Sequence, residues 1–139
     1  MFKRDELLRK LNVQPLDSLR FQGENLEMGL PRVYGGQVLA QALSAAAQTV
    51  DPEYSAHSLH GYFILPGDIN APIIFDVERV RDGGSFTTRS VKAIQHGKTI
   101  FNLMASFQLE QEGYSHQIEM PEAPNPDDLY SDKELFQKV

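Results

Sequence analysis

An uncharged, alanine-rich stretch from Gln37 to Val50 constrains this chain more than any other part of it. It lies between Gly35-Gly36 and Asp51-Pro52, and its apolar residues recur at the three- and four-residue intervals of a helix. A helix without a charged residue has no side suited to water, so we expect the rest of the fold to surround it. The residues that carry this pattern are Val38, Leu39, Ala42, Leu43, Ala46 and Val50.

The segments that follow the helix have the composition of β-strands. Residues 57–65 are rich in aromatic and aliphatic side chains, and residues 73–81 alternate apolar and acidic ones. Glycines in Asp82-Gly83-Gly84 and His96-Gly97-Lys98 supply the positive φ angles that tight hairpins need. We therefore expect an antiparallel meander of strands 73–81, 85–95 and 99–109. Upstream of the long helix, the pattern predicts an amphipathic helix over 4–12 and a strand over 19–24.

One long uncharged helix followed by an antiparallel meander predicts an α+β fold. The sheet has to curl around the central helix, because only then is the helix covered on most sides. This arrangement is the hotdog fold.

Length and charge limit the chain to one packed domain with an acidic tail. The 139 residues suffice for one core, which we place in residues 1–110. The net charge of −6 arises entirely in residues 110–139, where eight acidic side chains face two basic ones. Such a balance argues against nucleic acid as a partner. We expect residues 111–139 to be a proline-rich acidic linker that ends in the start of a further helix over 131–138, which Ser131 and Glu134 cap.

The absence of cysteine excludes a disulfide framework, a thiolate nucleophile and a cysteine-ligated metal site. Acidic residues follow the first basic pair directly, and no apolar run is long enough for a membrane span. From these features we expect a cytoplasmic protein without a membrane span, and we expect no cofactor.

Histidines 57 and 60 are weak candidates for metal binding or catalysis. Three residues apart on a strand, their side chains are expected on opposite faces of the sheet, with no cysteine or paired carboxylate to complete a metal site. Ser58 lacks the Gly-x-Ser-x-Gly context of a nucleophilic serine. We therefore expect no metal site and no serine triad.

The glycine pair before the long helix admits two interpretations. Without side chains, Gly35 and Gly36 allow a ligand to lie against the positive end of the helix dipole, where a thioester carbonyl would be polarised. Alternatively, they permit close packing of helix on sheet, and in that case Gly36→Val would overpack the contact. Gln37 could hold a water molecule or cap the helix. The basic residues Arg79, Arg81, Arg89 and Lys92 could contact phosphates or form a solvated strand face.

Several ordered motifs resemble the acyl-CoA thioesterase II family between residues 20 and 126. They are Arg32-Val33-Tyr34-Gly35-Gly36-Gln37-Val38-Leu39-Ala40-Gln41-Ala42-Leu43, His57-Ser58-Leu59-His60-Gly61-Tyr62-Phe63, Pro66-Gly67-Asp68, Pro72-Ile73-Ile74-Phe75-Asp76-Val77-Glu78, Arg81-Asp82-Gly83-Gly84-Ser85-Phe86-Thr87-Thr88-Arg89 and Ala105-Ser106-Phe107-Gln108.

The resemblance implies the N-terminal half of a double-hotdog enzyme that hydrolyses fatty acyl-CoA to a free fatty acid and CoA. It places the catalytic Asp, Thr or Ser and Gln in the second half, so this chain has no catalytic residue to assign. Gln37 cannot replace the acid, because an amide accepts no proton at neutral pH. Leu65 stands where the family pattern has Arg, which puts a phosphate role of that position in doubt. The substrate-binding candidates are Gly35, Gly36, Gln37, His57 and Gln108.

Two alternatives remain from other functional classes. The first is a stand-alone hotdog module that binds acyl-CoA or acts as a scaffold and pairs with itself. The second is a hotdog dehydratase, which we rank last because its catalytic His precedes the helix, whereas His57 and His60 follow it. The partners expected are acyl-CoA or CoA, together with a second hotdog half or a second copy of the chain.

Overall fold

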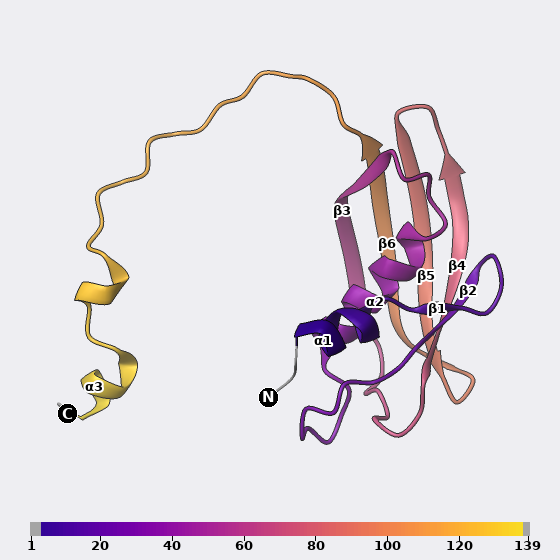
Figure 1. Cartoon of the computed structure of the whole chain (residues 1–139), viewed down its shortest axis with the longest axis horizontal. Helices are drawn as coiled ribbons and strands as arrows, with labels where there is room; N and C mark the ends of the chain where they lie inside the picture. Colours follow the sequence, from indigo (N-terminus) through magenta and orange to yellow (C-terminus); the bar gives the residue numbers. More distant parts are fainter. Residues whose placement is uncertain (1–3, 138–139) are drawn as a thin grey trace.

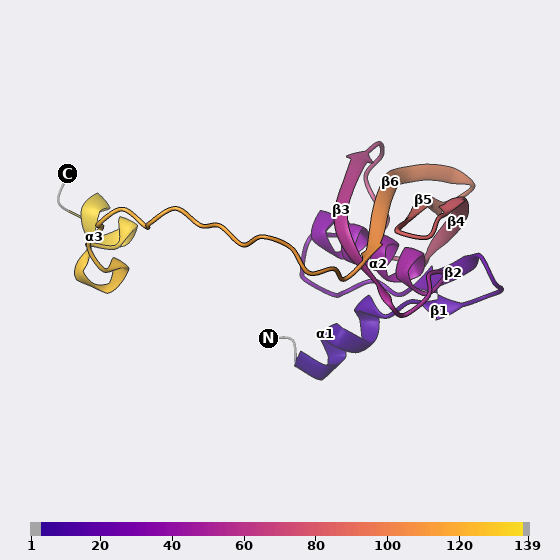
Figure 2. The ribbon, with the colours of Figure 1, turned by 90° about the horizontal axis from the view of Figure 1, so that it is seen from above.

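The uncharged stretch forms helix α2, Gly35–Ala47, and a six-stranded antiparallel sheet curves around one side of it (Figures 1 and 2). These features come from a computed structural model, which describes residues 4–137. The strands lie in the order β1-β2-β4-β5-β6-β3. In chain order the elements are α1 Arg4–Leu11, β1 Gln14–Pro15, β2 Arg20–Gly23, α2 Gly35–Ala47, β3 Tyr54–Phe63, β4 Ile73–Asp82, β5 Phe86–Gln95, β6 Lys98–Leu109, η1 Pro126–Asp128 and α3 Asp132–Phe136.

The structure confirms the α+β hotdog prediction, and the expected elements are all present. Strand β3 is shifted toward the N-terminus of its expected range, 57–65. Strand β1 was not expected, because its two residues, one of them proline, carry no alternating pattern. Residues 1–3 and 138–139 lie outside the described residues. They include Lys3, the first basic residue of the chain, and Lys138, the last residue of the helix expected over 131–138.

The core lies between α2 and the inner face of the sheet, which is the face turned toward this helix. Alternate residues of the central strands point inward, as the two-residue period of a strand requires. On β6, Leu103, Ala105 and Phe107 are about 1% exposed and mark this face. The other fully buried core side chains are Ala42, Ala45, Ala46, Ile73, Phe75, Val91, Ala93 and Phe101.

The two predicted hairpin turns differ in backbone conformation. His96 and Gly97 adopt φ angles of 50° and 71°, as expected for a two-residue turn between the paired residues Gln95 and Lys98. The prediction of positive φ at Gly83 and Gly84 was wrong. Gly83 is needed for a different reason, because a Cβ atom there would lie 2.7 Å from the carbonyl oxygen of Phe86.

The sheet covers one side of α2, so the expectation that it covers the helix on most sides was wrong for the opposite side. The side facing the sheet is buried from Gln37 to Ala46. On the opposite side, Ala40, Leu43 and Ser44 are partly exposed and Ala47 is exposed. Helix α1 lies beside this second side (Figure 1). A groove lies between the two helices.

The segment after β6 leaves the domain and is exposed at every residue from Glu110 to Gln137 (Figure 2). It has no regular structure until η1 and α3. The Ser131 hydroxyl accepts a hydrogen bond from the Glu134 N–H, and the Glu134 carboxylate accepts one from the Ser131 N–H, which is the predicted capping box. None of the helices within residues 4–137 is long and apolar enough to cross a membrane.

Candidate functional site

A cavity of about 360 Å³ opens at the start of α2, between this helix and the end of β3. Its walls are largely apolar, with Arg32 as the charged residue among them. The Tyr34 side chain makes no capping hydrogen bond to α2, and the first turn has no acidic residue. Nothing on the helix itself therefore offsets the positive end of its dipole beside the cavity. The lining residues are Arg32, Val33, Gly35, Val38, Phe63, Ile64, Leu65, Pro66, Gly67, Ile100 and Phe101.

The two glycines at the helix start have different surroundings. A Cβ atom on Gly35 would lie 3.0 Å from the Phe63 ring, so this glycine allows helix and sheet to approach closely beside the cavity. Gly36 is exposed, and a Cβ atom there would meet the exposed ring of Tyr34 at 2.5 Å. The expectation that Gly36 packs against the sheet was wrong, and the close contact belongs to Gly35.

Gln37 is buried next to these glycines, and other parts of the chain bind both ends of its amide. Its Oε1 accepts a hydrogen bond of 2.9 Å from the Leu26 N–H. Its Nε2 donates to the Glu24 carbonyl, to Asn25 Oδ1 and to Gln41 Oε1. Gln37 therefore holds the loop between β2 and α2 in place.

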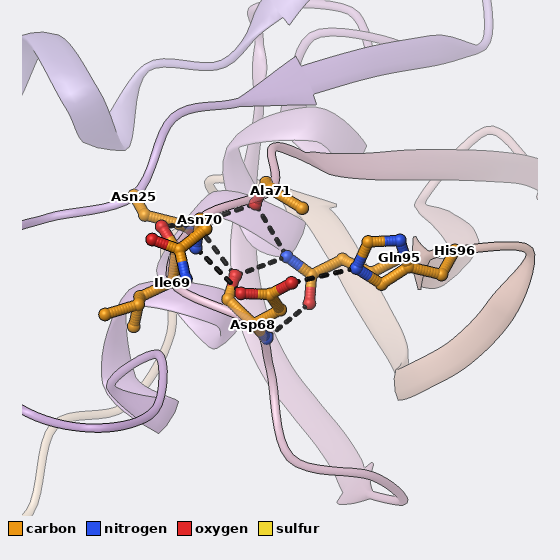
Figure 3. Close-up of polar contacts among 7 residues, drawn as sticks. All are labelled: Asn25, Asp68, Ile69, Asn70, Ala71, Gln95 and His96. Carbon is orange, nitrogen blue, oxygen red and sulfur yellow. Dashed lines mark hydrogen bonds and ion pairs between the residues drawn. The ribbon is translucent and has the colours of Figure 1, made fainter.

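The loop 64–72, which forms one wall of the cavity, is held by side-chain amides (Figure 3). Gln95 accepts from the Asp68 N–H and donates to the carbonyls of Asp68 and Ala71. Asn25 donates to the same two carbonyls and to that of Ile69. These bonds tie a loop without regular structure to β5 and to the segment after β2, so the cavity wall has a defined position.

The Asp68 carboxylate adds a charged contact to this loop. It accepts hydrogen bonds from the Asn70 N–H and from the ring of His96, whose Nε2 lies 2.9 Å from Oδ2 (Figure 3). These two interactions, the backbone one first, hold the pKa of Asp68 below its ordinary value of 3.8. The carboxylate is therefore charged at neutral pH, and its hydrogen bonds to Asn70 and His96 hold the loop in place.

A β-bulge in β3 changes the expected position of His57. The register with β6 shifts between Ala56 and Ser58, so His57 is the inserted residue. Its Nε2 lies 2.8 Å from Oγ of Ser106, on the outer face of the sheet, and its ring contacts Phe86. His60 pairs with Met104, two residues from Ser106 on the same face. The two histidines therefore share a face, and the expectation of opposite faces was wrong because one inserted residue reverses the alternation.

The five predicted substrate-binding residues form two separate groups. Gly35, Gly36 and Gln37 lie at the end of the molecule where α2 begins, next to Phe63. Gln108 lies at the other end of the sheet, where it pairs with Ser55, and it shares the outer face with His57. Phe63 follows His57 by six positions along β3, or roughly 20 Å at the usual rise of a strand. One copy of the chain does not bring the two groups together.

Of the four basic residues considered on the meander, Arg89 has the environment that differs most from the one expected. Its side chain is 2% exposed, so it forms neither a phosphate contact nor a solvated face as expected. It donates hydrogen bonds to the hydroxyl and carbonyl of Thr49, to the carbonyls of Arg81 and Thr88, and to the carboxylate of Asp82. It therefore joins the β4–β5 hairpin to the segment after α2. Arg79, Arg81 and Lys92 are exposed.

Arg32 lines the cavity but was not among the predicted binding residues. It directly precedes Val33, Tyr34 and the glycine pair, so its position beside the helix start was a usable signal.

Within residues 4–137, no group of three or more histidine, aspartate or glutamate side chains is arranged to hold a metal ion.

Comparison with known proteins gives consistent matches. The family model described as the acyl-CoA thioesterase N-terminal domain matches residues 24–108. Acyl-CoA thioesterase 2 of Haemophilus influenzae is 44% identical over 97% of this chain and 47% of that protein. Human acyl-coenzyme A thioesterase 8 is 48% identical over 86% of this chain and 38% of that protein. The crystal structure of acyl-CoA thioesterase II TesB2 from Mycobacterium marinum superposes with a TM-score of 0.76 at 48% identity, over 86% of this chain and 44% of that one. The chain thus spans less than half the length of these relatives.

Proposed function

The chain belongs to the acyl-CoA thioesterase family, to the N-terminal domain of these proteins, and from this premise we propose its function. We propose that it is the N-terminal half of a double-hotdog hydrolase that cleaves fatty acyl-CoA to the free fatty acid and CoA. By itself it has little or no hydrolase activity. Activity requires a second hotdog half, which supplies the groups that activate water.

The observation that carries this proposal is the absence of a general base on the cavity side of α2. The helix has no charged residue, and Asp68, the carboxylate of the adjacent loop, is bound by Asn70 and His96. Loss of a general base typically slows a hydrolysis ~10²–10⁴-fold. The dipole of α2 and the apolar cavity remain suited to holding an acyl thioester, so this half contributes binding.

Edge pairing of two hotdog units would unite the two groups of predicted binding residues. Strand β3 ends the sheet, and its second edge has no strand partner among residues 4–137. Antiparallel pairing of this edge with the same strand of a second unit would bring the His57 end of one beside the Phe63 end of the other. In this proposal Gly35, Gly36 and Gln37 position the thioester, while His57 and Gln108 contact the same substrate from the neighbouring unit.

A second candidate function follows from the same edge. Without a second half, the exposed β3 edge would pair with the β3 edge of another copy, because unpaired strand N–H and C=O groups favour such addition. The chain would then be a self-associating module that binds acyl-CoA or CoA without hydrolysing it.

The cytoplasmic location of the protein remains a prediction. Cell fractionation with an antibody to the chain would test it.

A chimeric enzyme tests the main proposal. This chain replaces the first half of the Haemophilus influenzae acyl-CoA thioesterase 2, to which it is 44% identical. We expect the chimera to hydrolyse several acyl-CoAs, whereas the 139-residue chain stays near background in the same steady-state assay. A folded chimera without activity would overturn the proposal, as would enzyme-like turnover by the chain alone that survives re-purification.

A binding measurement separates the two candidate functions. Calorimetry with a non-hydrolysable thioether analogue of acyl-CoA reports binding without requiring catalysis. Binding by the chain alone, combined with an inactive chimera, would favour the stand-alone module. Gly35→Val serves as the site variant, because its added side chain would meet Phe63 and narrow the cavity.

A further inference from the structure

The cavity at the start of α2 is lined in part by two segments without regular structure. They are segment 24–34, between β2 and α2, and loop 64–72, between β3 and β4. Hydrogen bonds fix loop 64–72 to the sheet, through the Gln95 side chain on β5 and the Ile100 carbonyl on β6. None of these bonds reaches α2, whose start also lines the cavity.

The Asn25 side chain connects loop 64–72 to α2. Its Nδ2 donates to the carbonyl oxygens of Asp68, Ile69 and Ala71, at 3.1, 3.0 and 2.7 Å (Figure 3). Its Oδ1 accepts a hydrogen bond of 3.1 Å from Nε2 of Gln37, in the first turn of α2. One side-chain amide thus binds the loop with its nitrogen and the helix with its oxygen.

Asn25 supplies most of the hydrogen bonds between the two segments. Beside its three bonds to the loop, the described residues give one more, from the Val33 N–H to the Gly67 carbonyl at 3.1 Å. Gln37 is 2% exposed and its Oε1 is held by the Leu26 N–H, so its side chain has little room to follow a shifted loop. Without the Asn25 amide, one backbone bond would join the loop to segment 24–34.

An amide suits both sets of partners of Asn25. The three loop carbonyls require a donor, whereas Nε2 of Gln37 requires an acceptor. A carboxylate of the same shape keeps the acceptor for Gln37 but turns an oxygen without a proton toward three carbonyl oxygens. Asn25→Asp should therefore detach the loop and keep the contact with α2.

We propose that Asn25 is a positioning residue of the candidate site, an inference that rests on the proposed function of the cavity. Asn25 is not one of the lining residues, and it acts through Gln37 and the loop. It holds the loop at a fixed distance from the start of α2, and this distance sets the room for an acyl thioester between them. Such positioning matters for the rate, because a misplacement of about 1 Å can cost roughly 10²-fold.

Distances between two spin labels test whether Asn25 holds the loop. The 139-residue chain has no cysteine, so Ile69→Cys in the loop and Ala47→Cys at the far end of α2 give two labelling sites, both exposed. Helix α2 is about 20 Å long, a separation that double electron–electron resonance resolves. We expect a narrow distance distribution with Asn25 present and a broader one after Asn25→Ala or Asn25→Asp.

Two comparisons separate positioning from a general loss of stability. Asn102→Ala removes the same amide from an exposed position on β6 and should leave the distribution narrow. In Asn25→Asp, acid should narrow the distribution again, because a protonated carboxyl group donates a hydrogen bond to the loop carbonyls. Glu24, Asp68 and His96 titrate in the wild-type chain as well, so that chain is the reference at each pH.

The chimera with the second half of the Haemophilus influenzae enzyme gives the catalytic readout. We expect Asn25→Asp in this chimera to lower kcat/KM for acyl-CoA at least about tenfold, because the thioester is no longer held in one place. Asn102→Ala should leave kcat/KM unchanged.

Two results would overturn the proposal. The first is a narrow distance distribution in Asn25→Asp at neutral pH, and the second is a broad distribution combined with an unchanged kcat/KM. An inactive chimera that carries Asn25 would instead count against the proposed function. The distance distribution needs no substrate, so in that case it would still decide whether Asn25 holds the loop.

Discussion

Strands β3 and β5 have ten residues each and pair with opposite sides of the same strand, β6, yet their environments differ. On β5, every second residue from Thr87 to Gln95 is buried. On β3, no residue is buried, although Leu59, Tyr62 and Phe63 make it at least as apolar. The two strands differ in their neighbours, because β5 has a strand on both sides, whereas β3 has one on a single side and lies at the edge of the sheet.

The difference bears on the proposed pairing of β3 with a second hotdog unit. An exposed edge strand in a monomeric protein usually carries charges, proline or a strong twist that prevents further pairing. Strand β3 has neither proline nor a Lys, Arg, Asp or Glu side chain, and its one irregularity is the bulge at His57. This composition agrees with the proposed pairing to a second hotdog unit.

The largest effect should come from the buried charge on β5. Arg89→Ala removes a side chain that is 2% exposed and leaves the carbonyls of Thr49 and Arg81 without its hydrogen bonds. We expect a loss of about 3 kcal/mol in the free energy of unfolding, measured by chemical denaturation. Arg89→Lys keeps the charge without the fork of donors and should lose less. A stability equal to wild type for Arg89→Ala would contradict the structural role.

A pair of matched truncations compares the two strands directly. Val91→Ala on β5 removes two fully buried methyl groups and should cost about 2–3 kcal/mol in the free energy of unfolding, with the cavity included. Leu59→Ala on β3 removes more carbon atoms from a side chain that is 38% exposed, and we expect a cost below about 1 kcal/mol in the isolated chain. Equal losses of unfolding free energy in the two variants would contradict the difference in burial between β5 and β3.

Charges on the β3 edge should break self-association and leave the fold intact. Leu59→Lys with Tyr62→Lys places one cation on each face of the edge strand. We expect the dissociation constant to rise at least about tenfold, measured by sedimentation over a concentration series. Val80→Lys changes a similarly exposed apolar residue on β4 and should leave association unchanged. A wild-type chain that is strictly monomeric at high micromolar concentration would contradict the premise of this experiment.

The smallest effect concerns the loop that follows β3. The folded pKa of Asp68 is lowered, so the contribution of its carboxylate to stability is complete above its ordinary pKa of 3.8 and is lost as pH falls through the lower folded value. Asp68→Asn should therefore make residues 64–72 exchange amide hydrogens faster at neutral pH, and the difference from wild type should shrink in acid. A difference that grows below pH 3.8 would contradict this sign.

The sequence predicted the elements of the fold much better than the contacts of individual residues. The uncharged helix and the alternating strands follow from local patterns, and α1, α2 and the meander lie where these patterns indicated. The position of His57 did not follow, because one inserted residue reverses the face of the sheet and leaves no mark in the composition. Arg89 was misassigned for a related reason, since a charged residue on a strand is buried only when groups distant in sequence, such as Thr49, bind it.

The single pairing of β3 also has a consequence for how the chain folds during synthesis. Its partner β6 begins 35 residues after β3 ends, so the ribosome makes β3 well before a strand exists to receive it. At usual rates of translation this delay amounts to roughly 2–7 s, during which an apolar segment without charged residues has no strand to pair with. The hairpins β4–β5 and β5–β6 join neighbouring segments and can form early, whereas β3 depends on a late, long-range contact. We therefore expect nascent chains that end before Lys98 to bind chaperones that recognise exposed apolar strands.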